Sequence, residues 1–227
     1  MQMLTGKKEN FLDKVPFERS NVWLHKNVID DFLKLKELAK AEGIELSICS
    51  AYRNYQRQLT IWNEKALGLR PLYNLEHKLV DPTTLDPEVV LSYLLRWSAI
   101  PGASRHHWGT DMDVYDQSAL NDDYQLQLSP VEYNQPGLLY QFNLWLTQIL
   151  KSKNNCGFFR PYQKDLGGVS PEPWHISHQK VASDFYNHFD LDVFIKNLED
   201  PAIELRDLLL KDPEYYFQTY VKNVSAN

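Results

Sequence analysis

The stretch from Ser104 to Asp113, which reads S-R-H-H-W-G-T-D-M-D, determines how the rest of this sequence is interpreted. It brings imidazole and carboxylate groups close together. A second short segment, E-P-W-H from Glu172 to His175, offers the same two groups. Imidazole and carboxylate are ligands of zinc in catalytic sites, where three protein ligands leave a fourth position for water. The two segments predict a metal held by His106, Asp113 and His175, with Glu172 beside it as a general base.

The residues after Gly109, T-D-M-D-V-Y, predict a tight turn that leads into a short strand. Because side chains alternate along a strand, Met112 and Val114 would enter a core while Asp111 and Asp113 would face a cleft. Two carboxylates on one face are unfavourable unless a cation or hydrogen-bond donors lie between them. A polar strand face in water is the alternative for an isolated D-x-D pair, and the second segment favours the cleft.

Prolines at positions 171 and 173 bracket Glu172, so a helix is not expected in the second segment. On a straight strand, Glu172 and His175 would point to opposite faces. Their cooperation in one site therefore requires a bend at Pro173.

The pattern S-x-H-x-x-G-x-x-x-D, which begins at Ser104, together with the later E-x-W-H, resembles the zinc D-alanyl-D-alanine carboxypeptidases and dipeptidases of the VanY type. Their wider superfamily includes lysostaphin-like endopeptidases and the Hedgehog signalling domain. A third segment, S-A-Y-R-N-Y-Q-R-Q from Ser50 to Gln58, resembles the S-G-Y-R-S segment of this family with its downstream glutamine. Three motifs in the family's order form a specific signal. One departure is Asp111, where the family commonly has a small residue such as alanine, and it bears on the shape and charge of the metal pocket.

The resemblance implies one zinc ion on the three ligands named above, with Glu172 as general base. It assigns substrate contact to Arg53 and Ser104, and Arg53 would stabilise the oxyanion that develops on the scissile carbonyl. The alternatives are a surface salt bridge for Arg53 and a turn cap for Ser104. Gln58 is expected to brace the site.

The other histidines are expected outside the ligand set. His107 would either face away from the metal or donate a hydrogen bond to a ligand. His178 would point away from His175 on a strand, so we predict a structural role for it. Three histidines are predicted to lie at the surface: His25, His77 and His188.

Composition limits the classes of partner. A chain of 227 residues fits a single domain, residues 1–227, with a substantial core. The net charge of -6 and the lack of a Lys/Arg-rich run disfavour nucleic acid. No apolar run is long enough to span a bilayer, and the first residues lack the apolar core of a signal peptide. We therefore expect a cytoplasmic protein, or a periplasmic or cell-envelope one if an export signal was removed. The oligomeric state is left open.

Apolar periodicity predicts helices at residues 28–39, 55–67, 88–98 and 138–150, and strands at 44–51 and 158–162. Residues 1–24 are expected to be irregular. From about residue 190 to 227, two prolines divide a helical extension into about three short helices. Cys49 and Cys156 are predicted to be buried free thiols. The fold that the resemblance implies is α+β, with a small antiparallel sheet that carries the zinc site on one face and helices packed on the other.

Three functions remain open at this point. The first is a carboxypeptidase or dipeptidase that removes D-alanine from peptidoglycan-derived peptides. The second is an L,D-carboxypeptidase or a cell-wall endopeptidase. The third is a non-catalytic, zinc-stabilised binding domain. Glu172 and Arg53 favour an enzyme.

Overall fold

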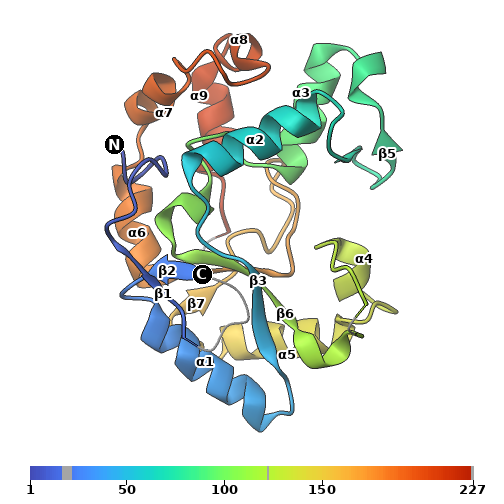
Figure 1. Ribbon diagram of the computed structural model, residues 1–227, viewed down its shortest axis with the longest axis vertical. Helices are drawn as coiled ribbons and strands as arrows, with labels where there is room; N and C mark the ends of the chain where they lie inside the picture. The colour runs from blue at the N-terminus through green and yellow to red at the C-terminus, as the bar shows by residue number, and fades with distance from the viewer. Residues whose placement is uncertain (17–21, 122, 226–227) are drawn as a thin grey trace.

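The computed structural model describes residues 1–16, 22–121 and 123–225 of the chain. Its centre is a four-stranded antiparallel sheet with the strand order β3–β6–β8–β7 (Figure 1). The strands are β3 (Leu46–Ser50), β6 (Asp111–Asp116), β7 (Phe158–Phe159) and β8 (His175–His178). Each of the three sequence motifs thus reaches one of three neighbouring strands, at Ser50 of β3, at the start of β6 and at His175 of β8.

One face of this sheet is apolar and packs against two helices, α1 (Ile29–Ala41) and α5 (Tyr140–Lys151). Met112 and Val114 of β6 are fully buried in this core, as the alternation predicts. In Figure 1 both helices lie at the lower end of the sheet. The polar side chains of β6 are therefore left on the opposite face, where the motifs meet.

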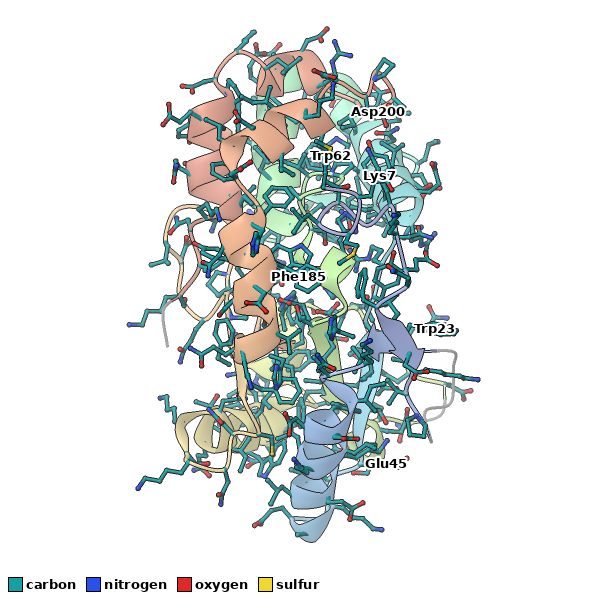
Figure 2. The ribbon with its side chains drawn as sticks, turned by 90° about the vertical axis from the view of Figure 1, so that its left-hand side faces the viewer. Lys7, Trp23, Glu45, Trp62, Phe185 and Asp200 are labelled. Carbon is teal, nitrogen blue, oxygen red and sulfur yellow. The ribbon has the colours of Figure 1, made fainter. Side chains whose placement is uncertain are left out.

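A second core lies beyond the polar face and joins α2 (Tyr55–Ala66) and α3 (Pro87–Trp97) to the C-terminal part of the chain. That part contains α6 (Gln179–His188), α7 (Leu191–Asn197), α8 (Arg206–Leu209), α9 (Pro213–Tyr216) and the π-helical turn η4 (Phe217–Val221). The Tyr55 hydroxyl donates to Asp200 at 2.6 Å, and Trp62 Nε1 donates to the Glu204 carbonyl at 2.9 Å. Figure 2 labels Trp62 and Asp200 in the upper part of the molecule, where these elements meet. The predicted helical extension is thus packed on α2.

Several short elements differ from the sequence prediction. Residues expected to be irregular contain two paired strands, β1 (Leu12–Lys14) and β2 (Trp23–His25). The strand predicted at 158–162 covers only the two residues of β7, and α6 was not predicted. The remaining elements are the hairpin of β4 (Leu72–Tyr73) and β5 (Leu79–Val80), the helix α4 (Pro130–Tyr133), and the 3-10 turns η1 (Pro82–Thr84), η2 (Arg105–Trp108) and η3 (Gln117–Ala119). Strands of two or three residues are too short to show an alternating pattern.

Both cysteines are free thiols, as expected, but the predicted burial is wrong for both. Cys156 is half-buried and Cys49 is exposed. The pairing of β3 with β6 shifts register between Ile48 and Ser50, so Cys49 sits at a bulge that turns it outward. No helix in the described ranges has the length and apolar character needed to cross a bilayer.

Candidate active site

The sheet register places the predicted ligands in a row. Asp113 on β6 stands opposite His175 on β8 and opposite Ser50 on β3, so the three side chains share one face. His106 reaches this face from η2, which connects to β6 through Gly109 in a left-handed conformation with φ of 64°. A Cβ atom at Gly109 would lie 2.8 Å from the backbone nitrogen of His25, so the turn requires glycine. One ligand atom each from His106, Asp113 and His175 lies within 4.8 Å of the other two.

Hydrogen bonds orient both imidazoles toward Asp113. His106 Nδ1 lies 2.8 Å from the Ala51 carbonyl, which can only accept, so Nδ1 carries the hydrogen of the neutral ring. The lone pair of His106 Nε2 then faces Asp113 Oδ2 at 3.5 Å. In the same way His175 Nε2 donates to Asp111 Oδ1 at 3.0 Å, and Nδ1 faces Asp113 Oδ1 at 3.3 Å. Both outward-facing nitrogens are therefore available as metal ligands.

The charges around this cluster suit a bound cation. Asp113 Oδ1 is buried without a hydrogen-bond partner in the described part of the chain. Burial lowers the pKa of His106 to about 4, so this ring is neutral at pH 7. Burial acts in the same direction on His175, but the surrounding carboxylates of Asp111, Asp113 and Glu172 raise its pKa well above the ordinary value. These carboxylates favour a positive charge at the ring, which a metal ion on Nδ1 would supply in place of a proton. Carboxylates gathered around two imidazole nitrogens fit a divalent metal ion.

Asp111 lies directly behind His175, on the same face as Asp113, and is fully buried. Besides His175, its carboxylate accepts hydrogen bonds from Arg105 Nε at 2.7 Å, Thr110 Oγ1 at 2.6 Å and Ser177 Oγ at 2.9 Å. Arg105 Nη2 also donates to Ser177 at 2.7 Å. A carboxylate behind a ligating histidine fixes the orientation of the ring. Sequence reasoning missed Arg105 and Ser177, although Arg105 directly precedes His106.

Glu172 is brought beside the metal ligands by the expected bend. The backbone nitrogen of His175 donates to the Glu172 carbonyl at 3.2 Å, which closes a turn over Pro173. Glu172 Oε2 lies 3.1 Å from His175 Nδ1, and its side chain is 16% exposed. The carboxylate therefore borders the metal position and remains open to water. Glu172, Arg53 and Ser104 line one cavity of about 310 Å³ together with the metal ligands.

Arg53 enters this cavity from the loop after β3, because the strand ends at Ser50. Its guanidinium donates to Gln58 Oε1 at 2.7 Å and to Ser50 Oγ at 3.0 Å. Gln58 is fully buried and is itself anchored by donation to the Ala99 carbonyl at 2.7 Å, which matches the expected bracing role. Within the described residues Arg53 forms no salt bridge. Ser104 is buried, and its side chain does not cap the following turn.

His107 and His178 lie outside the ligand set. The buried ring of His107 donates from Nδ1 to the Arg53 carbonyl at 2.5 Å and accepts from the Gly102 amide at 3.1 Å, so it fixes the loop that carries Arg53. His178 contacts Asp31 at 3.1 Å and caps α6, a structural role as predicted.

The surface prediction holds for two of the three remaining histidines. His77 and His188 are exposed. His25 is buried, because its ring stacks on Phe11 at a centroid distance of 5.6 Å and contacts the edge of Phe185.

Comparisons with known proteins agree with this geometry. The family model of VanY, D-alanyl-D-alanine carboxypeptidase, matches residues 21–181. An uncharacterized protein of Haemophilus influenzae is 31% identical over 122 residues, which cover 54% of this chain and 92% of the relative.

Two solved structures share the fold. The structure of VanYB in complex with D-Alanine-D-Alanine superimposes with a TM-score of 0.54 at 18% identity, over 84% of this chain and 90% of the other. A mutant of the vancomycin-resistance D,D-pentapeptidase VanY in complex with Zn(II) gives a TM-score of 0.51 at 19% identity, over 78% of this chain and 84% of the other. The family match spans all three motifs and the metal cluster, and the chain belongs to the VanY family of D-alanyl-D-alanine carboxypeptidases.

Proposed function

We propose that this protein is a zinc-dependent peptidase that removes D-alanine from the C-terminal end of peptidoglycan-derived peptides. One observation carries the proposal: two imidazole nitrogens and a buried carboxylate converge on one point, in the same cavity as Glu172 and Arg53. The family match supports the substrate class.

The donor set supports zinc as the metal. His106, Asp113 and His175 would supply two nitrogens and one oxygen, a set of three that is typical of catalytic zinc and leaves a position open. A zinc ion bound there would act as a Lewis acid on the substrate carbonyl and lower the pKa of water. A solved relative that shares the fold was crystallised with Zn(II).

The residues around the metal position have complementary roles. Glu172 is within reach of water in the cavity, takes a proton from the attacking water and returns it to the leaving amine. Arg53 is held by Gln58 and Ser50, so its guanidinium is already oriented when negative charge develops on the carbonyl oxygen. Ser104, which is buried in the cavity wall, is a substrate contact.

The test is to incubate zinc-loaded protein with peptidoglycan stem peptides and to identify the products by mass spectrometry. We expect a pentapeptide that ends in D-Ala-D-Ala to lose one D-alanine, and Glu172→Gln to abolish this release while the metal stays bound. Glu199→Gln, which alters an exposed glutamate that does not line the cavity, is the matched control. Cleavage of only the tetrapeptide would show an L,D-carboxypeptidase, and cleavage of internal bonds an endopeptidase. If zinc-loaded protein cleaves none of these peptides, the chain is a binding domain.

A further inference from the structure

Lys65 lies in the wall of the catalytic cavity, although its position near the end of α2 is typical of a surface lysine. Ile61 and Lys65 are four residues apart, on one face of α2, and both line the cavity. Lys65 Nζ donates to Ser98 Oγ at 2.7 Å and approaches the Trp97 carbonyl at 3.5 Å. These contacts hold the ammonium group at the end of α3, inside the cavity that contains Glu172.

The partners of the cationic side chains single out Lys65. Four such side chains line the cavity: Arg53, Lys65, Arg70 and Arg105. Arg70 is paired with Glu64 at 2.7 Å, and Arg105 with Asp111 at 2.7 Å. Arg53 is held by neutral groups next to the metal ligands, where the proposed reaction uses it. Among the described residues no carboxylate pairs with Lys65, whose hydrogen-bond partners are all neutral.

The electrostatic environment of Lys65 favours an added anion. Burial and the positive charge of Arg53 lower the pKa of Lys65 to about 8, while Glu172 acts in the opposite direction. Lys65 and Arg53 therefore repel each other across the cavity, and Glu172, which the proposed reaction uses as its base, is a carboxylate that acts on both cations without pairing with either. A carboxylate between them would relieve this repulsion and form charge-assisted hydrogen bonds.

A carboxypeptidase substrate brings such a carboxylate. Its C-terminal carboxylate lies one residue, about 3.5 Å of chain, beyond the scissile carbonyl. The cation that binds it must therefore share the cavity with the catalytic groups. We propose that Lys65 binds the free C-terminal carboxylate of the substrate and so makes the protein a carboxypeptidase rather than an endopeptidase. This inference rests on the proposed function.

The decisive measurement is binding without turnover. In the Glu172→Gln background, the dissociation constants of two peptides are compared: one that ends in D-Ala-D-Ala as the free acid, and the same peptide as its C-terminal carboxamide. We expect the acid to bind at least about 30-fold more tightly, since truncation of one partner of a buried charge pair costs about 2 kcal/mol or more. Adding Lys65→Met should remove most of this preference and leave carboxamide binding unchanged.

Two further variants make the result specific. Arg57→Met removes an exposed cation from the same helix and should preserve the preference for the acid. Lys65→Gln keeps a polar group on Ser98 without the charge, and it replaces Lys65→Met if circular dichroism shows that the methionine variant is misfolded. Either of two results would overturn the proposal. One is equal binding of acid and carboxamide when Lys65 is intact, and the other is a preference for the acid that persists in both Lys65→Met and Lys65→Gln.

Hydrolysis assays separate this proposal from the proposed function. With Glu172 intact, Lys65→Met should raise KM for the acid far more than it lowers kcat. If the protein with Lys65 and Glu172 intact cleaves the free acid and the carboxamide at equal rates, the peptidase assignment stands and the role of Lys65 is refuted. If neither peptide is cleaved, the peptidase assignment fails, and the binding comparison still decides whether Lys65 recognises the carboxylate.

Discussion

Replacement of Asp111 by alanine should damage the protein in two separable ways. Asp111 and Arg105 are 0% and 4% exposed and form an ion pair at 2.7 Å. Removal of the carboxylate leaves a buried guanidinium without its counter-charge, which costs about 3–5 kcal/mol of unfolding free energy. His175 Nε2 also loses its acceptor. Loss of such a partner typically weakens metal affinity by about 10- to 100-fold.

A double variant distinguishes the two effects. Replacing both members of a buried ion pair by apolar groups is often neutral for stability. Asp111→Ala combined with Arg105→Met should therefore recover most of the unfolding free energy. It should not recover metal affinity, because His175 still lacks its acceptor. Stability is measured by urea unfolding of metal-free protein, since a bound metal adds its own stabilisation. Metal affinity is measured by competition with a chelator.

The ion pair of half-buried Arg206 with exposed Asp207 provides the control. Asp207 is 91% exposed, so Asp207→Ala should change the unfolding free energy by less than about 0.5 kcal/mol and leave metal affinity unchanged. If the Asp111 single and double variants are equally destabilised and both bind metal as the original protein does, the assigned role of this carboxylate is wrong.

Four other predictions follow from the site and its supports. Alanine at any one of the three ligand positions should remove most of the roughly one bound metal ion per chain, as metal analysis of the purified variants would show; full occupancy in all three would refute the ligand set. Glu172→Gln should lower kcat by at least about 10²-fold with metal content unchanged, and equal activity would contradict its role as base. Because Lys65, which faces Arg53 and Glu172, has a pKa of about 8, kcat/KM for a free-acid peptide should fall as pH rises above that value, whereas Lys65→Met should lack this dependence. Asn197→Ala should lower the unfolding free energy by about 1–3 kcal/mol, because the buried Pro101 carbonyl loses its donor; an unchanged urea midpoint would show that this hydrogen bond contributes little to stability.

Local patterns predicted the parts of the fold that depend on neighbours in sequence. Met112 and Val114 alternate with Asp111 and Asp113, so one strand with one apolar and one polar face was evident before the structure. The bend at Pro173 followed from the need to bring Glu172 to the face of the ligands, and the turn found there fulfils it. Both are short-range effects of backbone geometry.

The parts that sequence did not reveal depend on contacts between distant segments. Arg105 looked like a neighbour of His106, and its role appears only when Asp111 and Ser177 from two strands surround it. The position of Lys65 near the end of α2 is typical of a solvated residue, and its place in the cavity depends on the end of α3, where Ser98 accepts its hydrogen bond. His25 is buried because Phe185, far along the chain, covers it. Burial of a polar residue depends on the partner segment, which local periodicity does not report.

Asp111 is also the position at which this chain departs from the usual family pattern of a small residue. A ligating histidine needs an acceptor at its second ring nitrogen, and here β6 supplies a carboxylate for that purpose. A buried carboxylate in turn needs a cation, which Arg105 supplies from the turn before the same strand. Aspartate alone or arginine alone would be unfavourable in this core. The two residues therefore form one unit with His175, and a relative with a small residue at the Asp111 position is not expected to keep a buried arginine at the position of Arg105.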